Sequence, residues 1–336
     1  RGRTFNPWHR EHTPGGSSGG AGAALAVGLA PLAHGNDYGG SIRYPSYCCG
    51  VGGIRPTLGR VPAYNPSASA ERPPSAQIMS VQGPMARRVR DVRLGLAALA
   101  ARDVRDPWWV PAPLEGPAPQ RPIRVALCPD PAGQGVHPAV ADAIRAAGRA
   151  LADAGYAVEE KEPPALARAI EAALHLLACD VRMVNLPDIL KLGDPGVRKA
   201  ASLFAAVAPE LSFEDYRKLL SERAGLLRQW LVFLEDFPLI VGPVSADPPF
   251  RYGFDTADQA AMTKVWRAQR FQYTMNFLGL PAAAVPAGTT KNAEGWPDGL
   301  PLGVQVIASR FREDLVLDAA EVIEAKLGLA TPIDPR

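Results

Sequence analysis

Short runs of apolar residues along this chain predict strands. Such runs lie at 31–35, 123–128, 156–161, 238–244, 281–286 and 302–308. A polar, glycine-bearing segment at 288–298 separates the last two runs, so we expect these two strands to form a hairpin with a long loop. The first run is expected to be a short buried strand.

Between these runs, apolar residues recur at the spacing of helices. Helices are expected at 18–29, 86–101, 138–154, 166–192, 198–208, 213–233, 256–277 and 313–327. Prolines interrupt 60–81 and 106–122, which we expect to be irregular and to run over the surface. The strand–helix–strand order of 123–161 favours an α/β architecture.

Composition places the chain among ordinary globular proteins. It has 336 residues, of which 47% are hydrophobic and 21% charged. The net charge of +2 indicates neither nucleic acid nor an acidic membrane as a partner. No apolar run is long enough for a membrane span, and four cysteines without C-x-x-C spacing indicate no zinc or redox site. A cytoplasmic protein with reduced thiols is therefore expected.

Two serines stand out because each follows a pair of glycines. They are Ser17, in the block 14–20, and Ser41, in the block 35–43. Neighbouring glycines leave a hydroxyl uncovered and let the backbone turn tightly, with N–H groups free to face a ligand. An acyl-transfer site needs this combination of a serine nucleophile and amides that hold an oxyanion. The Gly-x-Ser-x-Gly elbow also matches at 15–20, but no strand precedes it there.

Several blocks together resemble the amidase signature family, the serine hydrolases that use a Ser–cis-Ser–Lys triad. The blocks lie at 14–20, 35–43, 49–57, 83–87, 276–281 and 299–305. The resemblance implies an α/β fold, the amidase signature fold, with a central mixed β-sheet flanked by helices on both faces. It also implies a single domain over 1–336, in which the helical segment 162–235 forms a lid or pocket wall.

The resemblance also implies roles for individual residues. Ser41 corresponds to the nucleophile, and Ser17 to the cis-serine that relays its proton. Backbone N–H groups of Tyr38, Gly39, Gly40 and Ser41 would form the oxyanion hole. A neutral lysine would accept the proton from Ser17, and burial with neighbouring donors would keep it unprotonated.

Three further residues, Ser18, Asp37 and Arg43, match positions that hold the loop together by hydrogen bonds. The family's lysine lies well upstream of the glycine/serine block, and no lysine of this chain stands in such a context. The lysines are Lys161, Lys191, Lys199, Lys218, Lys264, Lys291 and Lys326. We therefore expect the chain to be the N-terminally truncated piece of a longer enzyme, inactive without that segment.

The function implied is that of an amidase, which hydrolyses a carboxylic amide to an acid and ammonia or an amine. No cofactor and no metal are expected, and the partner is a small-molecule amide, with a homodimer left open. One alternative is the amidase subunit of a tRNA-dependent glutamine amidotransferase. An alternative of another class is a non-catalytic binding or scaffold protein on the same fold, prompted by the missing lysine.

Overall fold

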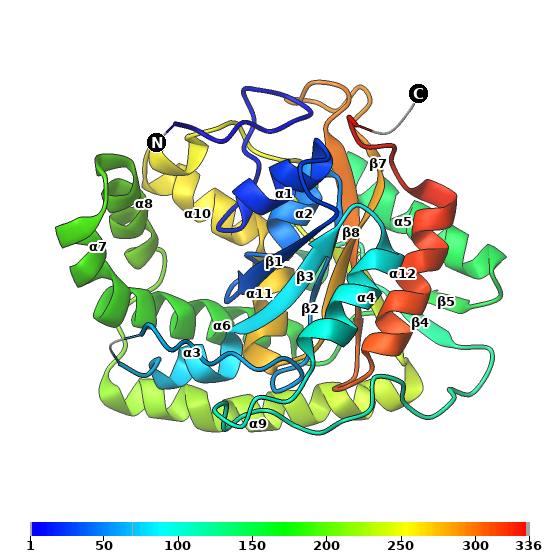
Figure 1. Ribbon diagram of the computed structural model, residues 1–336, viewed down its shortest axis with the longest axis horizontal. Coiled ribbons are helices and arrows are strands. Elements are labelled where there is room, and N and C mark those ends of the chain that lie inside the picture. Colours follow the sequence, from blue (N-terminus) through cyan, green and yellow to red (C-terminus); the bar gives the residue numbers. More distant parts are fainter. Residues whose placement is uncertain (1, 69, 334–336) are drawn as a thin grey trace.

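A mixed β-sheet runs through the centre of the molecule, with helices on either side (Figure 1). The computed structural model describes residues 2–68 and 70–333. Within them, the strands of the sheet are β1 (Leu32–Asp37), β2 (Gly52–Arg55), β3 (Val81–Ala86), β4 (Arg124–Leu127), β5 (Ala157–Glu160), β6 (Leu239–Pro243), β7 (Ala282–Thr289) and β8 (Pro301–Ala308). They lie in the order β1-β3-β2-β7-β8-β6-β4-β5.

Strand directions separate the sheet into two parts. Strand β4 pairs in parallel with β5 and β6, and the other neighbours are antiparallel. The parallel β4 and β5 are joined by a helix, which confirms the strand–helix–strand prediction. Strands β7 and β8 are antiparallel neighbours, with Ala282 opposite Ile307, and confirm the predicted hairpin.

The helices follow the predicted apolar spacing over most of the chain. They are α1 (Gly19–Ala26), α2 (Arg43–Cys49), α3 (Pro74–Met79), α4 (Val89–Leu99), α5 (Pro138–Asp153), α6 (Leu166–Asp180), α7 (Leu186–Leu192), α8 (Pro195–Ala205), α9 (Phe213–Asp236), α10 (Gln259–Ala268), α11 (Arg270–Leu278) and α12 (Glu313–Leu327). A π-helical turn, Val181–Asn185, joins α6 to α7. Within the described residues, none of these helices combines the length and the apolar character that a membrane span requires.

Each face of the sheet buries its own hydrophobic core. Helices α4, α5 and α12 cover one face, where Val92, Ile144 and Val316 are buried (Figure 1). Helices α6, α9 and α11 supply the core on the other face, which includes Trp230 and Phe277. A helix with one apolar face is stable when that face is buried against a sheet, so these two cores hold the layers together. The expected α/β fold with helices on both faces is confirmed.

The structure corrects three expectations about single elements. Strand β1 is an edge strand, and Leu32 at its start is 41% exposed, because β1 has a neighbour on one side only. The segment 60–81 is not irregular throughout, since Pro74 occupies the first turn of α3, where a missing N–H costs nothing. The helix expected over 256–277 is divided into α10 and α11 at Gln269.

Candidate active site

The two serine blocks lie against each other. Ser41 is half-buried in the turn between β1 and α2, and Ser17 is exposed just before α1. The backbone N–H of Ser18 donates to the carbonyl oxygen of Ser41 at 3.2 Å, which joins the two blocks directly. The peptide bond between Gly16 and Ser17 is cis.

Glycines allow the close packing of these blocks. Gly15 has a φ of +80°, and a Cβ there would lie 2.7 Å from the Cα of Pro45 in α2. A Cβ on Gly22 would lie 3.1 Å from the carbonyl oxygen of Pro45. Any side chain at these two positions would push α1 and the Ser17 loop away from the helix that follows Ser41.

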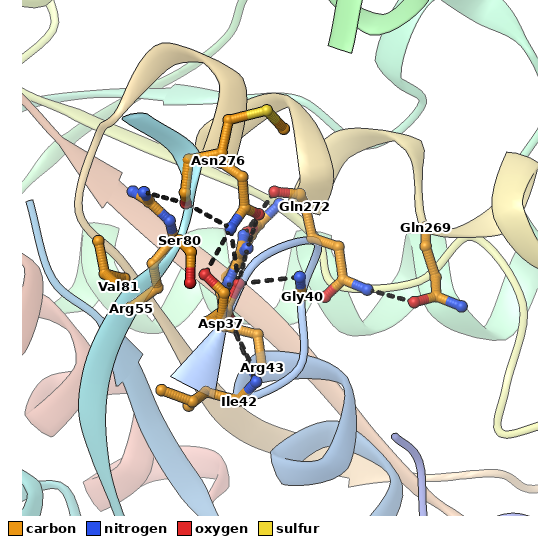
Figure 2. A network of polar contacts seen from close by, with 12 residues as sticks. Asp37, Gly40, Ile42, Arg43, Arg55, Ser80, Val81, Gln269, Gln272 and Asn276 are labelled. Atoms are coloured by element: carbon orange, nitrogen blue, oxygen red, sulfur yellow. Dashed lines mark hydrogen bonds and ion pairs between the residues drawn. The ribbon is translucent and has the colours of Figure 1, made fainter. Parts of the chain in front are cut away.

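A buried ion pair supports the turn that carries Ser41. Arg43 donates from Nη2 to Asp37 Oδ1 at 2.9 Å and from Nε to Asp37 Oδ2 at 3.0 Å, and both side chains are fully buried (Figure 2). Two parallel hydrogen bonds of this kind fix the relative orientation of a guanidinium and a carboxylate. Asp37 also accepts the backbone N–H of Ile42 at 3.2 Å. The pair therefore closes the turn from its inner side.

The remaining donors of Arg43 reach the centre of the molecule. Nη1 donates to the carbonyl oxygen of Gln272 at 2.7 Å and to Gln305 Oε1 at 3.0 Å, while Nη2 also donates to Asn276 Oδ1 at 2.6 Å. Burial raises the pKa of Asp37, but the charge and hydrogen bonds of Arg43 outweigh burial and hold that pKa well below its ordinary value. Asp37 is therefore ionised at neutral pH.

The expected oxyanion donors are not equivalent in this geometry. The N–H of Gly40 donates to Asp37 Oδ1 at 2.8 Å, so it is not free to face a substrate oxygen. Across residues 2–68 and 70–333, no hydrogen bond occupies the backbone N–H of Tyr38, Gly39 or Ser41. Three of the four amides are thus available, and Gly40 instead braces the turn.

Gln272 fills the space beside Gly40. Gly40 has a φ of +112°, and a Cβ there would overlap the side-chain amide of Gln272. Gln272 donates from Nε2 to Gln269 Oε1 at 2.6 Å, whereas its Oε1 is buried with no hydrogen-bond partner in the described structure (Figure 2). Nothing in the sequence singles out Gln272, because its position depends on α11 packing against a turn far away in the chain.

A second polar cluster holds Tyr38. Its hydroxyl lies 2.9 Å from Ser75 Oγ and 3.5 Å from Asp180 Oδ2, and Ser75 also donates to Asp180. Asp180 ends α6 and is 4% exposed. Burial raises the pKa of Asp180, and the hydrogen bonds from Ser75, Tyr216 and Tyr38 only partly oppose this. Sequence analysis missed this cluster, since Ser75 and Asp180 lie outside every recognisable block.

Apolar side chains surround the outer side of the turn. A Cβ on Gly39 would lie 3.0 Å from Leu177 of α6 and 3.6 Å from Trp266 of α10. The ring centroid of Trp266 is 4.1 Å from that of Phe204 in α8 and 6.0 Å from that of Tyr273 in α11. Leu177 and Phe204 belong to the helical segment 162–235, whose role as lid or wall remains a prediction.

Other nucleophiles and bases are poorly placed. Cys48 and Cys49 are fully buried, and burial raises the pKa of both thiols well above the ordinary value, which disfavours the reactive thiolate. Lysines with contacts in the described structure meet other partners: Lys161 pairs with Glu159, and Lys218 with Glu214. No described contact joins a lysine to Ser17 or Ser41.

Comparison with known proteins gives consistent matches. A family model described as Amidase matches residues 1–317. An indoleacetamide hydrolase from Bradyrhizobium diazoefficiens is 43% identical over 329 residues, which cover 98% of this chain and 62% of that protein. One chain of the glutamyl-tRNA(Gln) amidotransferase from Deinococcus radiodurans is 33% identical, over 96% of this chain and 70% of that protein.

Solved structures agree with the same grouping. The structure of 6-aminohexanoate cyclic dimer hydrolase complexed with substrate has a TM-score of 0.79 and 26% sequence identity, over 99% of this chain and 73% of that one. A bacterial aryl acylamidase of the amidase signature enzymes has a TM-score of 0.75 and 25% identity, over 98% of this chain and 69% of that one.

The mixed sheet and the paired Gly-Gly-Ser loops define the class as amidase signature proteins. This chain belongs to the amidase family. It spans 62% of the length of the indoleacetamide hydrolase that it matches.

Proposed function

We propose that the whole protein hydrolyses the amide bond of a small arylacetamide-type substrate to the acid and ammonia. The observation that carries the proposal is the turn 38–41, where Ser41 stands beside unoccupied backbone amides and is joined through Ser18 to the Ser17 block. A hydroxyl next to preorganised N–H donors is the arrangement that acyl transfer requires.

In the proposed mechanism, the Oγ of Ser41 attacks the amide carbon, and its proton passes to Ser17. Ser17 in turn gives its own proton to a neutral lysine. The amides of Tyr38, Gly39 and Ser41 hold the negative oxygen, a contribution of roughly 3 kcal/mol per donor in other serine hydrolases. The relay then reverses, protonates the leaving nitrogen and activates water to cleave the acyl-enzyme. The lysine is assigned to the part of the whole protein that lies outside residues 1–336.

The aryl class of substrate follows from the surroundings of the turn. Trp266, Phe204, Tyr273 and Leu177 offer aromatic and aliphatic surface next to Gly39. Flat apolar walls of this kind bind an aromatic ring by burying its faces. The match to an indoleacetamide hydrolase points to the same class. The unpaired, buried thiols of Cys48, Cys49, Cys128 and Cys179 fit a reducing compartment, for which we propose the cytoplasm.

The proposal is tested with the whole protein and two substrates, indole-3-acetamide and acetamide, by measuring ammonia release. We expect kcat/KM to be at least tenfold higher for the aryl substrate, because its ring buries apolar surface. Ser41→Ala should lower kcat by roughly a thousandfold or more, since the attacking group is lost. Ser221→Ala on the surface of α9 is the matched control and should leave both rates unchanged.

Two results would contradict the proposal. Turnover retained in a folded Ser41→Ala variant would remove Ser41 from the mechanism. Failure of a fluorophosphonate to label Ser41 in the whole protein, with no amide hydrolysed, would instead favour the non-catalytic scaffold.

A second candidate is the amidase component of a tRNA-dependent amidotransferase. The 33% identity to a chain of such an enzyme favours it, although it is lower than the 43% identity to the indoleacetamide hydrolase. Ammonia release from glutamine that appears only when a second protein chain is added would support this candidate. Hydrolysis of indole-3-acetamide by the protein alone would argue against it.

A further inference from the structure

A cavity of about 240 Å³ lies away from the turn that carries Ser41, and none of residues 38–41 contributes to its wall. Most of its wall is apolar and comes from segments far apart in the chain. The apolar lining residues are Leu58, Ile78, Trp108, Val110, Leu227 and Leu278. An apolar cavity of roughly 150 Å³ can hold benzene, so this one has room for an aromatic ring that carries a substituent.

Two arginines, Arg223 of α9 and Arg310 after β8, complete the wall. The Nε of Arg223 donates to the carbonyl oxygen of Phe277, which fixes the side chain. A Cβ on Gly279, where φ is +73°, would lie 3.0 Å from Nη2 of Arg223 and 3.5 Å from Leu58 Cβ. Glycine at this position therefore makes room for the guanidinium at the cavity.

Neither arginine has a counter-ion in the part of the chain that the structure describes. No carboxylate there lies within 4.0 Å of either guanidinium, whereas Arg60, Arg168 and Arg270 each pair with one. Burial lowers the pKa of Arg223, and the like charge of Arg310 lowers it further, to about 10. Two cations that face one apolar cavity without neutralisation favour the binding of an anion.

We propose that this cavity binds a small monocarboxylate with an aromatic or branched aliphatic body. The guanidinium of Arg310, with that of Arg223, holds the carboxylate, because its planar fork matches two carboxylate oxygens. The hydrocarbon body lies against Trp108, Leu227 and Leu278. This site is separate from the proposed amidase site and does not depend on its activity.

The probe is phenylacetate, titrated into the chain of residues 1–336 by isothermal calorimetry in low salt. We expect a Kd below about 1 mM and weaker binding as salt increases, since surface charges are screened. Benzyl alcohol, which has the ring without the charge, should bind at least tenfold more weakly.

Variants locate the binding. Arg310→Met changes an exposed side chain, so the fold is preserved, and it should weaken phenylacetate binding at least tenfold. Leu227→Trp should abolish binding by filling the cavity. Arg228→Met, which removes an exposed charge from the same helix, is the control and should have no effect.

No measurable binding of phenylacetate to the chain would overturn the proposal. Equal affinity in wild type, Arg310→Met and Leu227→Trp would also overturn it, because the ligand would then lie elsewhere, for instance beside Ser41. An equal loss in Arg310→Met and Arg228→Met would reduce the effect to general surface charge and would overturn it as well.

Discussion

Arg43 is the residue through which distant blocks of the sequence meet. Its guanidinium contacts Asp37 from β1, Asn276 from α11 and Gln305 from β8. Because each of its donors has an acceptor, the buried charge is compensated by both a carboxylate and neutral oxygens. The position of the Ser41 turn is therefore tied to the centre of the sheet by one side chain.

Replacement of Asp37 by asparagine should destabilise the fold. The variant keeps a side chain of the same shape but leaves Arg43 buried without a counter-ion, a change that costs about 3 to 5 kcal/mol in comparable buried pairs. The free energy of unfolding at pH 7, from urea titration, measures this. Asp318→Asn, which breaks an exposed pair with Arg93, is the control and should change stability by less than about 1 kcal/mol.

The pH dependence of this difference follows from the pKa of Asp37. That pKa lies below its ordinary value in the folded state, so ionised Asp37 contributes stability above pH of about 4, where the unfolded carboxyl is also ionised. The contribution is lost as pH falls through the acid range and the folded carboxyl is protonated. The gap between wild type and Asp37→Asn should shrink below pH 4, and a gap that stays constant would contradict the ion pair.

Sequence reasoning identified Asp37 and Arg43 as supports of the loop, but it did not find their full set of partners. Asn276 and Gln305 belong to blocks at 276–281 and 299–305 that carried the family resemblance. Their contact with Arg43 spans 233 and 262 residues, a separation at which local pattern carries no geometric information. Gln272 and Asp180 belong to no such block, so only the fold reveals them.

Among the elements, those with sustained apolar periodicity were predicted best. Helix α12 spans the expected residues, and α5 ends one residue earlier than expected. Short elements such as α3 and β2 were missed because four to six residues are too few for a period to show. The break between α10 and α11 was missed because nothing but tertiary packing requires it, with no proline or glycine there.

The junction of α6 with the π-helical turn carries a second consequence at this scale. Asp180 lies at that junction and contacts Ser75 of α3 and Tyr38 of the Ser41 turn. π-Helical turns occur often at functional sites, where they reposition a side chain. We therefore infer that Asp180 couples the helical wall to the turn that positions the proposed oxyanion donors.

Asp180→Asn tests this coupling through its pH dependence. A raised folded pKa means that the folded protein binds a proton more readily than the unfolded chain, so the stability of wild type should fall as pH rises from about 4 through the folded pKa. The variant has no carboxyl to titrate and should lack this decline, while its amide oxygen can still accept from Ser75. Urea unfolding across pH 4 to 8 measures both curves.

The matched control is Asp188→Asn, on the exposed surface of α7. It should follow the wild-type curve. An Asp180→Asn variant that declines in parallel with wild type would show that Asp180 is not the group responsible.

At the scale of the whole molecule, a second buried ion pair joins parts that the sheet does not connect. Arg60 follows β2 and pairs with Glu313, the first residue of α12, with Nη2 and Oε2 2.8 Å apart and both side chains 1% exposed. Nη1 of Arg60 also donates to the carbonyl oxygens of Ala112 and Pro113. The proline-rich crossing at 106–122 is thereby fastened to the helix layer.

Glu313→Gln should loosen this junction as a unit. The amide still offers an oxygen to the backbone N–H of Thr57, which Glu313 accepts at 2.8 Å, but Arg60 would keep a buried charge without a counter-ion. We expect a loss of about 3 to 5 kcal/mol in the free energy of unfolding. Because Arg60 also holds the crossing, trypsin should cleave at Arg105 and Arg121 at least tenfold faster in native conditions. Asp318→Asn, on the same helix but exposed, should change neither quantity measurably. Faster cleavage without any loss of stability would mean that the pair fastens only the crossing, and stability lost with unchanged cleavage would mean that the crossing is held by other contacts.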